Sequence, residues 1–474
     1  MIDLNEGRIE INTKWSKGNV LKDDNSIGHL SIKENEIMFN IEGTGDIFAR
    51  NFIGYSEGKT FKVFTYGQQE LDSTGCFYRV SKACLYIGDN YAYDKDDNII
   101  NGIESFSFEI PELVDWLKIP SVEFGILDDK TPIIHELETP IISLKDEKVK
   151  VYIKYENSNL WEGISNINEM TLRKKPRIFV EFEKTQNDTM VVNYIRILTR
   201  FFSMLIGKVS SAIDIRLSLK SEKTSVWLFI NEDFSVNNEV NLYSISYRTT
   251  YQEVSEQLKI WFETWYDFSN DSSFMFLQNY FFSSCSKKHW MIEELFLTYV
   301  KFIEGYDLRI SQDEKKAESL YESLVDVMKS HDIIKILLPE FKKVGSKSKY
   351  KEKDIARWIS NGFFERVKLD ARIKRIDERF FKIISSNSSN VIEGISSNDL
   401  YEKIAKTRNY YSHFKPDSEG ILDMKEIYNL IPVMKFMITI ILLSHMGLDN
   451  DKIESIIIKD DVFWSFTKHL RKEK

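Results

Sequence analysis

Residues 424–447 read MKEIYNLIPVMKFMITIILLSHMG, and from Ile431 onward apolar side chains occur at nearly every angle around a helix. A helix that is apolar all round is buried, either in a large core or in a membrane. The run is broken by Pro432 and Lys435, whereas a membrane span needs about 20 consecutive apolar residues. The stretch therefore predicts a buried helix at the centre of an antiparallel helical bundle, with no membrane segment.

The chain before residue 250 has a different pattern. Short alternating runs of β-branched and aromatic residues, separated by Gly, Asn and Asp, are typical of β-strands. The clearest runs are HLSIKENEIMFNIEG (29–43), TFKVFTYG (60–67), CFYRVSKACLYIG (76–88), IESFSFEI (103–110), KVKVYIKY (148–155), RIFVEFEK (177–184), AIDIRLSL (212–219) and SVWLFI (225–230). One helix is predicted at 188–208, where Asp188 or Thr189 can cap the start and Gly207 can end it.

From about residue 251 the apolar spacing becomes that of amphipathic helices. The predicted helices are QEVSEQLKIWFETWYDF (252–268), KKHWMIEELFLTYVKFIEGYD (287–307), SQDEKKAESLYESLVDVMKSH (311–331), DARIKRIDERFFKII (370–384), NDLYEKIAKTRNYYSHF (398–414) and the opening stretch. SSNSSN at 385–390 predicts a surface loop. The fold class is therefore α+β: a β-rich N-terminal domain (1–250), a connecting helix (251–285) and an all-α helical domain (286–474).

The charge of the chain is unevenly distributed. The net charge is −9, and all of it lies in residues 1–250, which hold 29 Lys and Arg against 38 Asp and Glu. Residues 342–375 carry twelve basic residues against four acidic ones. The net negative charge of the chain argues against a general nucleic-acid coat protein, whereas the basic strip is compatible with binding a phosphate backbone. A solvated helix face with a lysine-rich loop is the alternative for this strip.

The cysteines and the N-terminus indicate a reducing compartment. The three cysteines, Cys76, Cys84 and Cys285, have no metal-ligand spacing and are too few for a disulfide framework. The first fifteen residues mix charges and lack the apolar core of a signal peptide. We therefore expect a cytoplasmic protein.

The stretch TRNYYSHF (407–414) is the candidate functional motif. Its helix can begin with a capping box of Ser396 and Asp399, and Pro416 lies just beyond its end. Arg408 and His413 are five residues apart, roughly 140° around an ideal helix, so one rigid helix does not aim both at one point. A long Arg side chain can reach round, the helix end can distort, or two copies can meet across a two-fold axis. The alternative without function is a surface pair near a helix terminus, where the dipole favours a basic residue.

These residues resemble the HEPN family. Arg408-Asn409-x-x-x-His413 matches the R-x4-6-H signature in the form common among HEPN ribonucleases, and IAKTRNYYSHF followed by an apolar helix ending LLSHMGL resembles the ApeA-type HEPN proteins of bacterial phage defence. FIEGYDLRI (302–310) is similar to a second helix of that family, with one extra residue before Arg309. That family also has a β-rich domain before the helical one.

The resemblance implies a metal-independent endoribonuclease without cofactors, which cleaves tRNA or another structured RNA in abortive-infection defence. Arg408, Asn409 and His413 are then the catalytic residues. Further candidates are the RNA-binding residues Tyr410, Tyr411, Lys406 and Lys415 and the supporting residues Glu304, Tyr306 and Arg309. Because Glu304 lies within a mostly apolar helix, it needs a partner, and Arg408 is the natural one. A solvent-facing Glu304 and core-packed tyrosines are the alternatives.

The expected reaction uses the 2′-OH of the RNA as nucleophile, with His413 moving a proton and Arg408 stabilising the phosphate. We expect a homodimer or a higher even oligomer, and a phage-derived trigger protein as a possible partner of the N-terminal domain. The alternative function is a non-catalytic HEPN module for dimerisation and for binding RNA or a nucleotide. A structural scaffold without a nucleic-acid role is a third possibility.

Overall fold

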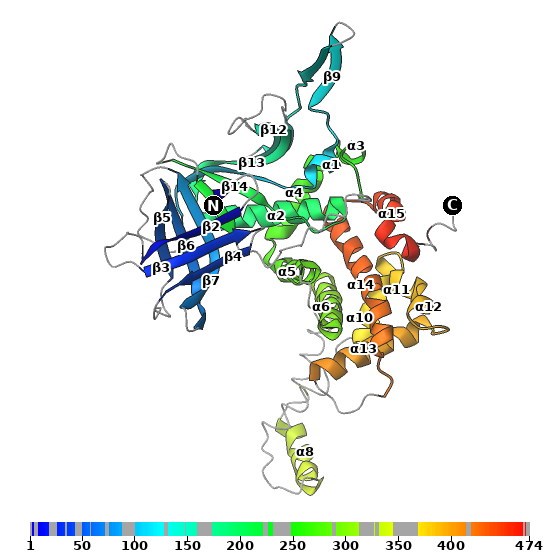
Figure 1. The fold of residues 1–474 in the computed structure, drawn as a ribbon. Helices are drawn as coiled ribbons and strands as arrows, with labels where there is room; N and C mark the ends of the chain where they lie inside the picture. The colour runs from blue at the N-terminus through cyan, green and yellow to red at the C-terminus, as the bar shows by residue number, and fades with distance from the viewer. Residues whose placement is uncertain are drawn as a thin grey trace. The chain divides into compact units, whose positions relative to one another are not determined.

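The computed structural model of the chain is shown in Figure 1. It describes residues 2–3, 8–18, 26–33, 36–42, 50–56, 58–71, 75–87, 100–127, 131–146, 148–158, 173–220, 226–230, 248–286, 291–311, 327, 331–344, 368–413, 419–467 and 470. The chain divides into two compact units. The first contains Met1–Asp271, Phe282–His289 and Leu442–Ser465, and the second contains Ser272–Phe281, Trp290–Ile441 and Phe466–Lys474.

The first unit is built on a 13-stranded sheet and a separate two-stranded sheet. The strands are β1 (Ile2–Asp3), β2 (Arg8–Lys17), β3 (Ser26–Lys33), β4 (Glu36–Ile41), β5 (Asn51–Ser56), β6 (Lys59–Leu71), β7 (Cys76–Ile87), β8 (Ile103–Glu109), β9 (Val122–Leu127), β10 (Thr131–Glu136), β11 (Ile142–Asp146), β12 (Val149–Ser158), β13 (Arg173–Gln186), β14 (Ile213–Leu219) and β15 (Val226–Ile230). Each of the eight predicted runs contributes a strand, so the β-rich N-terminal region is confirmed.

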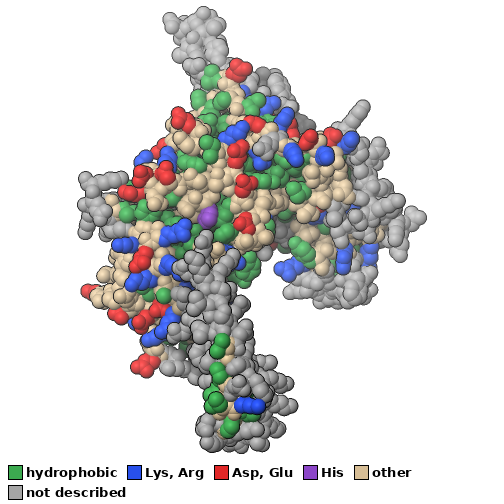
Figure 2. Space-filling model, turned by 180° about the vertical axis from the view of Figure 1, so that it is seen from behind, with side chains coloured by type: hydrophobic (Ala, Val, Ile, Leu, Met, Phe, Trp, Pro, Cys, Tyr) green, Lys and Arg blue, Asp and Glu red, His purple; other side chains and the backbone are tan. Residues whose placement is uncertain are grey.

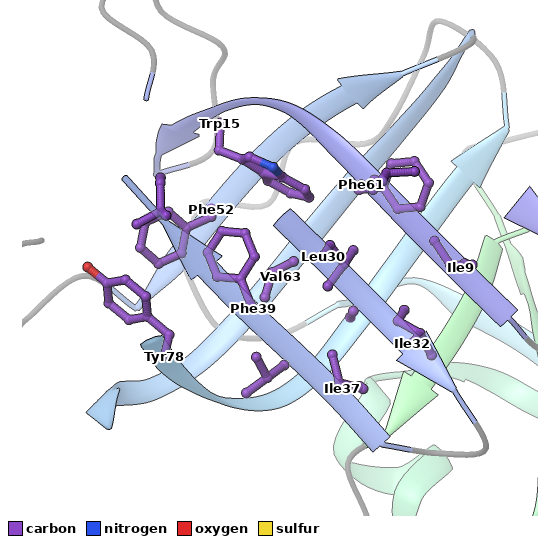
Figure 3. Packing of buried hydrophobic residues seen from close by; sticks show 14 of the residues in the cluster. Ile9, Trp15, Leu30, Ile32, Ile37, Phe39, Phe52, Phe61, Val63 and Tyr78 are labelled. Atoms are coloured by element: carbon purple, nitrogen blue, oxygen red, sulfur yellow. The ribbon is translucent and has the colours of Figure 1, made fainter. Parts of the chain in front are cut away.

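Six strands of this sheet close into a ring. The order β7-β4-β3-β2-β5-β6 returns to its start because β6 also pairs with β7. The interior is filled by aromatic and branched side chains, with the Trp15 ring 4.9 Å from that of Phe39 (Figure 3). Gly28 and Gly54 make room for this indole, since a Cβ on either would lie within 2.8 Å of it. The interior of this closed ring of strands is therefore a packed core.

From β7 the sheet continues through β15, β14, β8, β13, β12 and β11. The helix α2 (Asp188–Ile206) packs on this part, with Tyr194 against Phe182 of β13. The helix ends at Gly207, which has φ +88, as predicted, but its N-cap is Asn187, whose side chain accepts a hydrogen bond from Met190 N at 3.1 Å. The prediction of Asp188 or Thr189 as the cap is therefore wrong. The Asp188 carboxylate instead accepts a hydrogen bond from Lys82.

The other helices are α1 (Leu113–Leu117), α3 (Tyr251–Val254), α4 (Leu258–Asn270), α5 (Ser272–Ser286), α6 (Ile292–Ile310), α8 (His331–Val344), α10 (Leu369–Arg379), α11 (Ile383–Ser386), α12 (Ser388–Val391), α13 (Ser397–His413), α14 (Met424–His445), α15 (Asn450–Lys459) and a 3-10 helix, η1 (Asp461–Thr467). In the second unit, α6, α10 and α13 pack on one another. The α+β fold class, with a helical C-terminal region, is confirmed.

The run 385–390 does not form a surface loop, because it contributes to α11 and α12 and Asn387 is 3% exposed. The Asn387 amide donates hydrogen bonds to Ile383 O and Phe466 O, which hold it inside. Most of the helix predicted at 311–331 lies outside the described residues.

The helix α14 is buried as predicted, with eleven hydrophobic residues of 427–443 at 0% exposure. By length and composition α2 and α14 are both apolar enough to cross a membrane, but 72% and 67% of their most apolar windows are buried inside the protein. Burial of this kind is that of core helices.

Candidate functional site

The motif lies on α13, which starts as the sequence predicts. The Ser396 hydroxyl donates a hydrogen bond to the Asp399 carboxylate at 2.6 Å and accepts one from Asp399 N at 3.2 Å. One face of the helix is buried, and its residues are Leu400, Tyr401, Ile404 and Thr407. The Thr407 hydroxyl accepts a hydrogen bond from Leu422 N at 2.8 Å, which ties α13 to the segment before α14. These contacts fix the rotation of α13 and hence the directions in which residues 408–413 project.

Arg408 is held from two sides. Its Nη2 donates to Glu304 Oε2 of α6 at 2.8 Å, and its Nη1 donates to Asn409 Oδ1 at 3.1 Å. The side chains of Arg408 and Glu304 are 22% and 26% exposed, so water still reaches the pair. The Arg408 Nε is buried and has no hydrogen-bond partner among the described residues. These two contacts use two of the five N–H groups of the guanidinium, so donors remain that no described residue accepts from.

His413 is the last residue of α13 and is exposed. The described residues give its ring no hydrogen-bond partner, so the imidazole is accessible to a ligand or to a second chain. Asn409 is half-buried and its carbonyl oxygen accepts from Arg408, which places Asn409 with the guanidinium and not with His413. One chain therefore presents an anchored arginine and an accessible histidine.

Tyr410 and Tyr411 stand edge to face, with ring centroids 5.1 Å apart and planes at 82°. Both are half-buried. The Tyr411 hydroxyl lies 3.9 Å from Met424 Sδ, and burial, followed by the nearby Glu293 carboxylate, raises the pKa of Tyr411. Lys406 is exposed on the same helix. The other lysine of the predicted RNA-binding set, Lys415, lies outside the described residues.

The three supporting candidates on α6 have different positions. Glu304 contacts Arg408, as the sequence suggested. Tyr306 is 2% exposed and its ring packs against Phe302 in the core, where burial raises its pKa to about 12. Arg309 is exposed and donates to Gly305 O at 2.6 Å. Of the three, the structure joins only Glu304 to the motif.

Sequence reasoning missed Asp307, a fully buried carboxylate one residue after Tyr306. Arg375 donates to it through Nε at 2.7 Å, and Arg372 Nη1 lies 3.6 Å away. Both arginines belong to the predicted basic strip. In the structure they hold α10 against α6 through Asp307. The sequence signal that could have found Asp307 is the stretch FIEGYDLRI (302–310), in which Asp307 directly follows the core residue Tyr306. The strip between 345 and 367 lies outside the described residues.

Among the described residues on the face drawn in Figure 2, basic and acidic side chains are interspersed, so these residues do not form a broad one-sign field there. Within the described ranges no group of three or more His, Cys, Asp and Glu residues is placed to hold a metal ion.

Comparison with known families agrees with this architecture. Residues 297–452 match the family model Apea-like HEPN, and residues 50–265 match the model ApeA N-terminal domain 1. The helical match contains Glu304, Arg408, Asn409 and His413. No curated protein and no solved structure matches the chain.

The fold and the two matches define a protein with a β-rich domain ahead of an HEPN domain. The chain belongs to the ApeA-type HEPN proteins. ApeA HEPN domains indicate an anti-phage defence family, and the HEPN family is generally related to ribonucleases.

Proposed function

We propose that the chain is a metal-independent endoribonuclease of an abortive-infection defence system, acting in the cytoplasm on tRNA or another structured RNA. The observation that carries the proposal is the end of α13, where a guanidinium with unused donors lies five residues before an accessible imidazole. These are the groups that phosphate binding and proton transfer require. The family relation to ribonucleases supports the same reading.

In the proposed reaction, the 2′-oxygen of a ribose attacks the adjacent phosphorus. A bond from the 2′-oxygen to phosphorus forms, and the bond from phosphorus to the 5′-oxygen of the next nucleotide breaks. The products are a 2′,3′-cyclic phosphate and a 5′-hydroxyl, and the proton of the 2′-OH leaves as another reaches the 5′-oxygen. His413 moves a proton in one of these transfers, and Arg408 stabilises the charge that builds on the phosphate. DNA lacks the nucleophile, so it is not cut.

Asn409 holds the Arg408 guanidinium in position, since its carbonyl oxygen already accepts from Nη1. Tyr410 and Tyr411 offer ring faces for an unpaired base, each contributing about 1–3 kcal/mol where they stack. Lys406 and Lys415 add charge toward the phosphates. Arg309 and Tyr306 have no role in this proposal beyond the packing of α6.

The active unit is proposed to be a homodimer or a higher even assembly. Arg408 projects toward α6 of its own chain, while His413 lies roughly 140° further round the helix. A two-fold axis near the end of α13 would bring the exposed His413 of one chain to Arg408 of the other. The N-terminal domain would then restrain the nuclease until a phage-derived trigger protein binds it.

The alternative function is a non-catalytic HEPN module that dimerises and binds RNA or a nucleotide. The observation in its favour is the Glu304 carboxylate on Arg408, because a phosphate must displace it. Binding of RNA without cleavage would distinguish this function from the nuclease.

The decisive experiment incubates the purified full chain with total tRNA in EDTA, with and without extracts of phage-infected cells as a source of the trigger. The nuclease predicts cleavage, 2′,3′-cyclic phosphate ends, and loss of cleavage in His413→Ala and in Arg408→Ala. Arg379→Ala, which removes an exposed arginine of α10, is the matched control and should cut normally. Cleavage that survives both α13 substitutions would refute the proposed site.

A mixing experiment tests the shared site. Arg408→Ala and His413→Ala chains are each inactive, but a mixed dimer with trans sites has one intact Arg408–His413 pair. Random mixing makes about half of the dimers mixed, each with one of two sites intact, so about a quarter of wild-type activity should return. A site built within one chain gives no recovery, and that result would reject the dimer proposal while leaving the motif in place.

A further inference from the structure

A cation-lined cavity lies in the first compact unit, where the segment 248–254 meets α15. Its volume is about 150 Å³. Its polar lining includes Arg248, Glu253, Lys452, Ser455 and Lys459. None of these residues belongs to the α13 motif, so the cavity is a separate feature that the proposed nuclease does not use.

Arg248 is buried, with 7% of the residue exposed. Its Nε donates to Asp460 Oδ2 at 2.7 Å, its Nη1 donates to Met204 O at 2.7 Å, and its guanidinium lies over the Phe463 ring. Its third nitrogen, Nη2, donates to no acceptor in the described ranges. Arg248 is one of the residues that line the cavity. A ligand in the cavity can therefore accept from Nη2 without displacing either of the two hydrogen bonds that Arg248 already makes.

The charge of the lining favours an anion. Asp460 balances Arg248, which leaves Lys452 and Lys459 facing the single carboxylate of Glu253. Lys459 Nζ contacts Glu253 Oε1 at 3.0 Å, whereas Lys452 Nζ donates to the Glu253 backbone oxygen at 3.2 Å. The other carboxylate oxygen of Glu253 accepts from Thr250 N in the capping box of α3. The lysines therefore retain donors and a net positive charge.

We propose that this cavity binds a small phosphate-type oxyanion, either inorganic phosphate or a phosphate group of a nucleotide. A cavity of about 150 Å³ accepts a benzene-sized molecule, and a phosphate group is smaller. Its oxygens would accept from Arg248 Nη2 and from the two lysine ammonium groups in charge-assisted hydrogen bonds. The ligand would join the segment that follows the β-rich domain to α15, and so strengthen the packing of that helix.

The test is binding of inorganic phosphate to the full chain by calorimetry, with thermal unfolding in parallel at constant ionic strength. Saturable binding and a rise in Tm are expected, because a ligand that binds only the folded state stabilises it. The double variant Lys452→Gln, Lys459→Gln should weaken phosphate binding at least tenfold. The matched control Lys184→Gln, Lys220→Gln removes two exposed lysines of the same unit and should bind phosphate normally.

Competition separates the two sources of the phosphate group. If ATP displaces phosphate at lower concentration than phosphate itself, the ligand is a nucleotide. If ATP does not displace phosphate, the site is for the free oxyanion. Absence of saturable phosphate binding, or equal binding by the glutamine pair and its control, would overturn the proposal. Arg248→Gln is a second variant, and it should abolish binding in protein that still unfolds cooperatively.

Discussion

Replacement of Glu304 by glutamine tests the function of Arg408 directly. The change removes the negative charge that holds Arg408 Nη2 at 2.8 Å but keeps a side chain of the same length. If the guanidinium serves RNA phosphate, Glu304 is its competitor in the free protein. The variant should therefore bind RNA more tightly than the parent.

The size of the effect follows from the exposure of the pair. The two side chains are 22% and 26% exposed, so the ion pair is screened by water and contributes about 1 kcal/mol. Since 1.4 kcal/mol corresponds to a tenfold change in affinity, Glu304→Gln should lower the Kd for RNA by about fivefold. The gain should shrink at high salt, which screens the lost pair as well as the phosphate contact.

The assay uses fluorescence anisotropy with labelled tRNA in the His413→Ala background, where the RNA stays intact. Glu294→Gln is the matched control, because it removes one exposed carboxylate from the same helix, about 15 Å away along α6. Equal gains in both variants would show a general charge effect and refute competition at Arg408. Weaker binding by Glu304→Gln would show that Glu304 positions Arg408 for the phosphate.

Three further predictions concern stability. Gly54→Ala brings a Cβ to 2.7 Å from the Trp15 indole, so it should lower the free energy of unfolding by about 1–3 kcal/mol. Urea titration measures this change, and an unchanged unfolding midpoint would contradict tight packing inside the closed ring of strands. Asp307→Asn replaces the carboxylate that pairs with Arg375 by a neutral amide. It should lower the free energy of unfolding by about 3 kcal/mol, measured as a lower Tm. Burial raises the pKa of Tyr306 from 10.0 to about 12, so the folded state holds the phenol proton more tightly; this contribution is complete below pH 10 and is lost as the pH rises toward 12. Tyr306→Phe should make the decline in stability over that range shallower, and an unaltered slope would argue against the buried phenol.

The strands and most helices of the described chain could be predicted because periodicity is a local property. Closure of the ring could not, since it depends on β6 pairing with both β5 and β7 and no short window contains that information. The cap of α2 was missed for a related reason. Three cap-forming residues stand in a row at 187–189, and the choice between them depends on Lys82, which lies on β7 and binds Asp188.

The site shows the same division between local and distant information. The pairing of Glu304 with Arg408 could be expected, because a carboxylate in an apolar helix requires a partner. The burial of Tyr306 could not be read from the motif that contains it, although Phe302 four residues earlier places an aromatic on the same face. The ion pairs of Arg372 and Arg375 with Asp307 could not be predicted, because a run of basic residues has the same sequence pattern whether it faces solvent or a buried carboxylate.

The contact between α6 and α13 has a consequence for control of the site. Arg408 exchanges one oxyanion for another when RNA replaces Glu304, so its charge is never left without a partner and the exchange has a small cost. The balance therefore depends on how firmly Glu304 is presented, which is a property of α6. A shift of α6 by the length of one hydrogen bond would therefore suffice to release Arg408, without rearrangement of α13 itself.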